Sequence, residues 1–279
     1  MISNVYIDGV QVNNDSTSLR SVEDASAADI AMSDYARGGR SGRVLSTPFY
    51  RGFAISMEWF ITARSYQDLI TQRDRLARLF RLKPDKDTEQ KRTLGFELAN
   101  GVDKEIDVIF APYRGNITPQ DATTSLLQIN AKSEVEFFTS RTVKTATVRV
   151  YDGGGFGIPM GIPLDMSVSP SQRASVLNNE GNAEYYPLIT ISGELNAFDL
   201  TNETIGQAIS YGVTLAAGDT LVLDMYNRTA VLNGSDNALA DISGDWWYLD
   251  SGNNSIKLTT TGTPTGSAII TYKDAYRGL

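Results

Sequence analysis

The residue types that most enzymes use for nucleophilic and redox chemistry are missing from this chain. Its 279 residues include no histidine and no cysteine. This excludes Ser-His-Asp and Cys-His catalytic sites, zinc fingers, His-ligated metal centres and redox dithiols. Three kinds of chemistry remain possible, because they need only Asp, Glu, Lys and carbonyl groups. They are carboxylate chemistry such as glycoside hydrolysis, covalent chemistry at lysine, and cation sites made of oxygen ligands. We therefore expect a protein that is not an enzyme, with no catalytic residue, no cofactor and no metal site.

The remaining candidates for such chemistry are acidic residues near expected turns: Asp199, Asp224, Asp236, Asp241, Asp245 and Asp250. Asp245 and Asp250 could supply a general acid and a general base, and the other four could bind calcium. However, the chain has no regular Asp-x-Asp-x-Asp loop, and Asp near a turn commonly caps backbone amides. We favour the turn-capping role.

Trp246, Trp247 and Tyr248 form an aromatic run that could stack against sugar rings. Neighbouring side chains of a strand point to opposite faces, so at least one of the two tryptophans should fill the core. Trp247 shares a face with Leu249, and we assign that face to the core. No His or Arg stands beside the run to hold sugar hydroxyls, so we favour core and subunit packing and keep Trp246 as a candidate contact residue.

Arginines are concentrated in two places in the first half of the chain. Between Ser26 and Arg43 the apolar periodicity fades, which predicts a loop that is either solvated or reaches a partner or nucleic acid. The second place is the polar face of a helix expected near residues 65–82, which could be a solvated face, a subunit contact or an anion site. The net charge of −8, from 25 basic and 33 acidic residues, argues against nucleic acid. The candidate contact residues are therefore Arg37, Arg40, Arg43, Arg73, Arg78 and Trp246.

Most of the first half shows the alternating pattern of strands. An Asp8-Gly9 turn predicts a hairpin over residues 5–12, and Asn100-Gly101 predicts a second hairpin between two short apolar runs. Further strands are expected at residues 53–61, 94–98, 106–110, 126–138 and 145–150.

A single helix interrupts these strands. Ser65, with Asp68 three residues later, resembles a capping box, an apolar stripe runs from Leu69 to Phe80, and Pro84 closes the segment. This pattern predicts a β-rich first domain that contains one α-helix.

A glycine- and proline-rich stretch at residues 151–165 follows, and we expect a linker there. A phosphate-cradling loop is the alternative, but no Lys-Ser/Thr pair follows it. Beyond it, short alternating runs separated by Gly, Asn or Asp predict a β-sandwich or jelly roll. The expected domains are thus residues 1–150 and 166–279. The runs are at residues 185–192, 209–215, 220–225, 229–232, 246–249, 255–260 and 267–272.

The sequence shows no basic and apolar leader and no apolar stretch of the roughly 20 residues that a membrane helix needs. We expect a protein that stays unexported and is not inserted in a membrane. The lack of cysteine agrees with synthesis in a reducing cytoplasm.

The order of these pieces resembles the distal tail proteins of long-tailed, non-contractile bacteriophages. In the second half, the elements follow one another in the same order as in that family. The order is a strand, a tight turn, a returning strand that ends in Asn-Gly, and a Leu-x-x-Gly-x-Asn turn. In the first half the resemblance rests on architecture. The stretches that carry it are residues 155–160, 191–202, 221–224 through 231–234, and 245–254.

The resemblance implies a mainly β fold with an N-terminal belt domain and a galectin-like C-terminal sandwich. It also implies a six-membered ring at the distal end of the phage tail, in contact with the tail tube protein, with the central hub or tail-associated lysin, and in some cases with receptor-binding proteins. A virion protein of this kind would be made in the cytoplasm of the bacterial host. The alternative is a carbohydrate-binding adhesin of the same virion.

Overall fold

The structure of the chain is a computed structural model. The residues that it describes are 2–25, 28, 30–31, 34–36, 43–45, 49–50, 52–81, 90–111, 114–115, 122–150, 174–260 and 265–279.

The chain forms two compact units, and the second is inserted into the first. Unit 1 comprises Met1–Arg141 and Tyr276–Leu279, and unit 2 comprises Thr142–Ala275. The sequence places the division at residue 150, whereas the strand Lys144–Arg149 belongs to unit 2, because it pairs along its whole length with a strand near the end of that unit. The expected linker at residues 151–165 lies outside the described residues.

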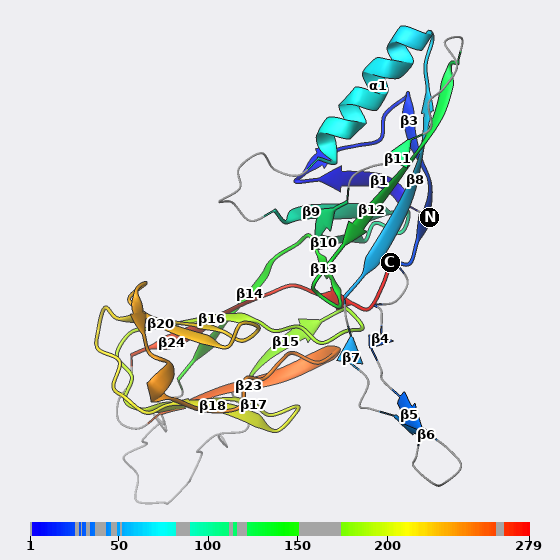
Figure 1. The fold of residues 1–279 in the computed structure, drawn as a ribbon. Coiled ribbons are helices and arrows are strands. Elements are labelled where there is room, and N and C mark those ends of the chain that lie inside the picture. The colour runs from blue at the N-terminus through cyan, green and yellow to red at the C-terminus, as the bar shows by residue number, and fades with distance from the viewer. Residues whose placement is uncertain are drawn as a thin grey trace, which may run out of the picture. The chain divides into compact units, whose positions relative to one another are not determined.

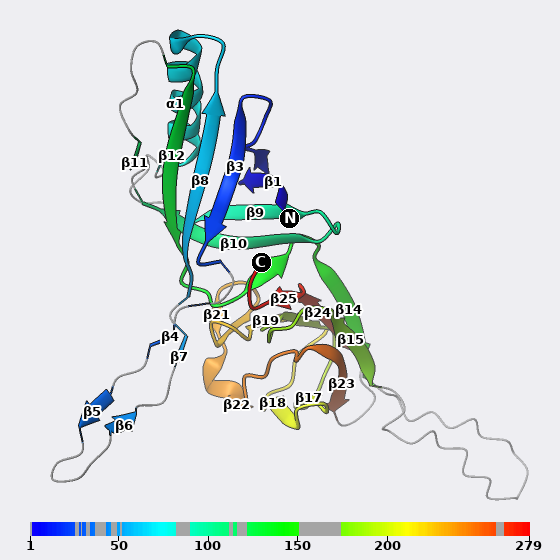
Figure 2. The same ribbon diagram turned by 90° about the vertical axis from the view of Figure 1, so that its right-hand side faces the viewer.

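Unit 1 is built on an antiparallel sheet in the order β2-β1-β9-β10-β12-β8-β3, with β11 beside β12 and β13 beside β10. Figure 2 shows β12, β8 and β3 side by side. The expected hairpins are confirmed: Asp8 and Gly9 have φ values of 49° and 79°, as a tight two-residue turn requires. The bounds are β1 Ile2–Ile7, β2 Val10–Gln11, β3 Thr17–Glu23, β8 Ala54–Thr62, β9 Arg92–Leu98, β10 Asp103–Phe110, β11 Arg114–Gly115, β12 Thr124–Lys132, β13 Phe138–Ser140 and β25 Ala275–Tyr276.

The helix α1 (Tyr66–Leu79) begins where the sequence predicts it (Figure 1). The Ser65 hydroxyl accepts a hydrogen bond from the Asp68 backbone N–H at 3.2 Å, which satisfies one of the free amides of the first turn. Leu69 and Leu76 are buried on the apolar face. The ring of Phe80, just past the helix, lies 5.8 Å from that of Trp59 on β8, so this end of the helix packs against the core of unit 1.

Between Ser26 and Arg43, where the sequence predicts a loop, the described residues instead include strands. β4 (Ile30–Ala31) pairs with β7 (Phe49–Tyr50), and β5 (Asp34–Ala36) pairs with β6 (Arg43–Leu45), both antiparallel. Backbone pairing with residues beyond Arg43 gives this segment its regular structure, although its apolar periodicity is weak.

Unit 2 is a sandwich of two antiparallel sheets around one core, as the sequence predicts. We name them the β16 sheet, in the order β14-β24-β16-β19-β20-β21, and the β23 sheet, in the order β15-β23-β17-β18-β22. Inward-facing residues of both sheets form a single apolar cluster. The bounds are β14 Lys144–Arg149, β15 Ser175–Asn179, β16 Leu188–Ser192, β17 Phe198–Asn202, β18 Gln207–Tyr211, β19 Thr220–Asp224, β20 Thr229–Leu232, β21 Asp236–Asn237, the 3-10 turn η2 Leu239–Asp241, β22 Ile242–Gly244, β23 Gly252–Thr260 and β24 Ser267–Tyr272.

The fold class is therefore confirmed: the described chain is mainly β, with α1 in unit 1. No helix among the described residues is long and apolar enough to cross a membrane.

One predicted strand is wrong. Residues 246–249 form no ladder, and Leu249 makes an isolated bridge with Tyr185 instead. The alternation of burial is nevertheless present, since Trp247 and Leu249 are fully buried while Trp246 and Tyr248 are partly exposed. Side chains from other strands supply the hydrogen bonds that a neighbouring strand would have made.

Candidate interaction surfaces

The segment Trp246–Asp250, which we name the aromatic segment, is held in place without a β-ladder. The Trp247 indole N–H donates to the Leu200 carbonyl at 3.1 Å in the core. Leu249 exchanges two backbone hydrogen bonds with Tyr185, at 2.7 and 3.0 Å. These contacts fix the inward face of the segment.

Buried asparagines complete the hydrogen bonding of this segment. Asn202 and Asn254 are fully buried. The Asn202 amide donates to the Tyr248 carbonyl at 2.8 Å, and Asn254 both donates to the Asp250 carbonyl at 2.8 Å and accepts from the Asp250 N–H at 2.9 Å. Because a buried backbone polar group without a partner costs about 1–3 kcal/mol, these amides hold the segment in one conformation.

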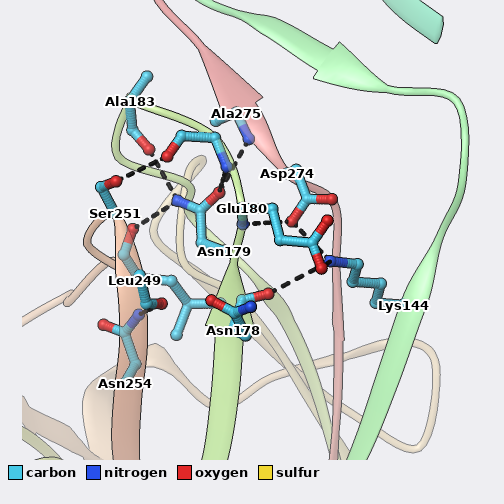
Figure 3. A network of polar contacts seen from close by, with 12 residues as sticks. Lys144, Asn178, Asn179, Glu180, Ala183, Leu249, Ser251, Asn254, Asp274 and Ala275 are labelled. Atoms are coloured by element: carbon cyan, nitrogen blue, oxygen red, sulfur yellow. Dashed lines mark hydrogen bonds and ion pairs between the residues drawn. The ribbon is translucent and has the colours of Figure 1, made fainter. Parts of the chain in front are cut away.

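A third buried asparagine, Asn179, ties together three stretches of unit 2 (Figure 3). Its side-chain amide donates to the Ala183 carbonyl at 2.8 Å. Its side-chain oxygen accepts from the N–H groups of Gly181 and Ala275, each at 3.1 Å. This single side chain thus links the end of β15 to the last residue of the unit.

Next to it lies an ion-pair cluster, also visible in Figure 3. The Lys144 ammonium is 2.9 Å from an Asp274 carboxylate oxygen and 3.4 Å from a Glu180 oxygen. Burial lowers the pKa of Lys144, but the hydrogen bonds and charges of the two carboxylates outweigh it, and the net effect is a raised pKa. Lys144 therefore stays charged at neutral pH and neutralises the buried Asp274.

Three tyrosines, which we name the tyrosine group, gather beside the aromatic segment. The ring of Tyr186 lies 5.9 Å from that of Tyr226 and 5.8 Å from that of Tyr248. Tyr226 is 47% exposed, so the group reaches the surface. Burial, with the charges of Glu184 and Asp250, raises the pKa of Tyr248 above its ordinary value. Its phenol is therefore a neutral donor and acceptor at physiological pH.

Two of the acidic residues singled out from the sequence, Asp224 and Asp250, cap backbone amides as expected. The Asp224 carboxylate accepts from two backbone amides of its own turn, at 3.0 and 2.9 Å, and Asp250 accepts from the following amide at 2.7 Å. Asp199 accepts from the Ser210 hydroxyl at 2.5 Å. Within the described ranges, no group of three acidic side chains is arranged to hold a metal ion. The remaining residues are Asp236, bonded to the neighbouring Ser235, and the exposed Asp241 and Asp245.

The arginines of α1 divide into two kinds. Arg75 is used within unit 1, since its guanidinium donates to the Thr17 hydroxyl at 3.5 Å and the Gln11 carbonyl at 3.4 Å. Arg78 is exposed, and among the described residues its guanidinium bonds to a carbonyl of its own helix, at 3.3 Å. Arg73 has no hydrogen-bond or ion-pair partner in the part of the chain that the structure describes. Arg73 and Arg78 therefore have cationic groups available for a partner.

The other contact candidates belong to other parts of the chain. Arg43 starts β6, and Arg37 and Arg40 lie outside the described residues. Trp246 is half-buried and packs against the core of unit 2. The described contact candidates thus belong to different elements of the chain.

The buried polar residues are not predicted from the sequence. Asparagine is expected in turns, whereas Asn254 lies within β23 on the same face as the buried Ile256 and Leu258. A polar residue on an otherwise apolar strand face is a signal that could have identified it. Nothing in the local sequence marks Lys144 and Asp274, whose partnership depends on strands far apart in the chain.

Comparisons with known proteins give one family and a small set of similar structures. Residues 180–276 match the family model described as the C-terminal domain of the siphovirus-type tail component. A comparison with curated protein sequences finds no match.

Among solved structures, the crystal structure of SPP1 Dit (gp 19.1) is 13% identical, covers 98% of each chain and has a TM-score of 0.63. The phage P2 baseplate in its activated conformation with Ca is 11% identical over 94% of this chain and 92% of the other, with a TM-score of 0.47. Residues 180–276 thus resemble the C-terminal domain of siphovirus-type tail components, and the chain shares its fold with SPP1 Dit, in agreement with the resemblance seen in the sequence.

Proposed function

We propose that this chain assembles into a closed ring of six copies at the distal end of the tail, where it joins the tail tube protein to the central hub. The observation that carries the proposal is the fold shared with SPP1 Dit over 98% of both chains. That protein is described as a paradigm of the hub adsorption apparatus in phages that infect Gram-positive bacteria. The same proposal includes synthesis of the chain in the host cytoplasm. It also includes contacts with a tail-associated lysin and with attached receptor-binding proteins.

Two features of unit 1 support ring formation. The strands β2 and β3 stand at the two ends of its main sheet, so each has an edge that another chain could pair with. Arg73 and Arg78 give α1 two available cations on a chain with a net charge of −8. A head-to-tail contact between unlike surfaces closes into a ring when its rotation allows.

The test is the native mass of the purified protein, together with class averages from electron microscopy. We expect a mass of about six times 30.5 kDa and a six-fold ring. The double variant Arg73→Gln/Arg78→Gln should shift the mass towards the single chain. The matched control Arg73→Lys/Arg78→Lys keeps both charges and should keep the ring. A chain that stays monomeric at every concentration, with and without tail partners, would contradict the proposal.

A carbohydrate-binding adhesin is the second candidate, and the exposed ring of Tyr226 in the tyrosine group favours it. Binding to an array of neutral glycans, lost in Tyr226→Ala and kept in Val213→Ala, would support it. Val213 is a suitable control because it is an exposed residue of the same unit, at 45%.

A further inference from the structure

Two neighbouring register rows on the outer face of the β16 sheet carry little charge, and the exposed Arg149 of β14 lies in the next row. One register row crosses five strands through Thr147, Ile269, Thr190, Val222 and Val231. All five side chains are exposed or half-buried, and Ile269 is 40% exposed. This row is therefore a band of β-branched, uncharged side chains on the surface of a chain whose net charge is −8.

The adjacent row continues the same composition. It contains three threonines, Leu188 at 42% exposure, and Asp224. The carboxylate of Asp224 is directed to the backbone of its own turn, so it leaves little free charge on the face. Just beyond this row, Tyr186 lies two residues before Leu188, and Tyr226 lies two residues after Asp224. Depletion of charge together with tyrosine at one end is the composition of a protein interface core.

We propose that this face, which we name the neutral face, pairs with the neutral face of a second copy of the chain. Two acidic copies repel each other wherever carboxylates meet, and the neutral face is where they can approach without that repulsion. In a two-fold contact each surface meets the same surface of the other copy. The uncharged Thr, Ile, Leu and Val side chains therefore face one another, and the contact does not bury an unpaired charge.

The size of the face predicts how strong this pairing is. Five strands that are spaced about 4.8 Å apart and are about 17 Å long give at most about 400 Å² for each copy. The total of about 800 Å² is below the 1,200–2,000 Å² of a stable interface. A single pair should therefore form only at high protein concentration, whereas several copies held in one assembly would bind another assembly much more tightly.

The test measures the association of the full-length protein by sedimentation over a wide concentration range. The expected result is a doubling of the mass at high concentration, from monomer to dimer or from ring to paired rings. Ile269→Glu places like charges against each other in the contact and should abolish the doubling. The matched control Val176→Glu changes a residue that is 64% exposed on β15 of the other sheet, and it should leave the doubling intact. Thermal unfolding checks that both variants are folded.

A second measurement uses the absence of cysteine from the chain. Thr190 lies in the middle strand of the first row, so Thr190→Cys should be cross-linked to its own copy by a bismaleimide that spans the about 10 Å between stacked sheets. Val176→Cys should not be cross-linked.

Three results would overturn the proposal: wild-type protein that never doubles in mass, doubling that survives Ile269→Glu, or cross-linking at Val176→Cys as efficient as at Thr190→Cys. Loss of glycan binding in Ile269→Glu, without any doubling in the wild type, would assign the face to a saccharide instead. The mass doubling is independent of the ring, because the Arg73→Gln/Arg78→Gln variant should lose the ring and still double from one chain to two.

Discussion

Lys144 and Asp274 are 130 residues apart in the sequence, yet the lysine Nζ lies 2.9 Å from an oxygen of the Asp274 carboxylate. The Asp274 side chain is 5% exposed and that of Lys144 is 26% exposed. The same Asp274 oxygen also accepts the Glu180 backbone N–H at 2.8 Å. The ion pair therefore fastens the first strand of unit 2 to the segment that follows its last strand.

Lys144→Met should destabilise unit 2 by about 3 kcal/mol, because it leaves a buried carboxylate without its cation. Denaturant unfolding of the full chain measures the change. Glu180→Gln is the control, since that carboxylate is 64% exposed and its pairing should be worth less than about 1 kcal/mol. Asp274→Asn in the Lys144→Met background should recover part of the loss, because asparagine keeps the acceptor without the charge. Equal stability of Lys144→Met and wild type would show that the pair does not hold the two segments together.

Asn254→Asp should loosen the aromatic segment, because a carboxylate cannot donate to the Asp250 and Gly252 carbonyls that the amide now serves at 2.8 and 3.0 Å. We expect a loss of about 1–3 kcal/mol from the unsatisfied buried groups, and faster hydrogen exchange at residues 248–252. The matched control is Asn253→Asp, one residue earlier and exposed, which should change neither. Unchanged exchange in Asn254→Asp would mean that the Asn254 amide is not needed to hold the segment.

Trp247→Ala should cost about 3–5 kcal/mol, since it removes a fully buried side chain and leaves a cavity. It also leaves the Leu200 carbonyl without the indole N–H. Trp246→Ala should cost less because Trp246 is only half-buried. The melting temperatures of the two variants give the comparison. If both variants melt like wild type and only glycan binding is lost, the assignment of Trp247 to the core would have to be withdrawn.

Asp219 should make unit 2 less stable in acid. Hydrogen bonds from the Asn233 side chain and the Ala216 N–H hold the pKa of its carboxyl below the usual 3.8. A lowered folded-state pKa adds stability that is complete above the unfolded-state pKa of about 3.9 and is lost as the pH falls through the folded value. Melting temperatures between pH 7 and pH 2 should therefore fall less steeply in Asp219→Asn than in wild type.

Much of the fold could be predicted because its signals are local. The Ser65 cap, the Asp8-Gly9 turn and the alternation of residues 53–61 each depend on neighbours within a few positions, and each is confirmed. The strand expected at residues 246–249 is wrong for the opposite reason. Alternation reports which side chains are buried, whereas a strand also needs a paired backbone, and here Asn202 and Tyr185 supply those bonds from some 45 and 65 positions away.

The candidate site was harder to predict than the fold for the same physical reason. Arg75 and Arg78 look equivalent on a helical wheel, but the guanidinium of Arg75 reaches Thr17 and Gln11, about sixty residues earlier in the chain. Which cations remain available for a partner is decided by such long-range contacts. The sequence therefore indicates where arginines gather, and the structure shows that Arg75 is engaged within unit 1.

The insertion of unit 2 between Arg141 and Tyr276 has a consequence for how such proteins can diversify. Its first and last strands pair in register, with Lys144 opposite Tyr272, so the module begins and ends at neighbouring points. A recombination event with breakpoints near these two positions would exchange a complete folded cassette, including both partners of the Lys144 and Asp274 pair. The recipient would need to close only a short gap, which favours inheritance of the two units from different ancestors.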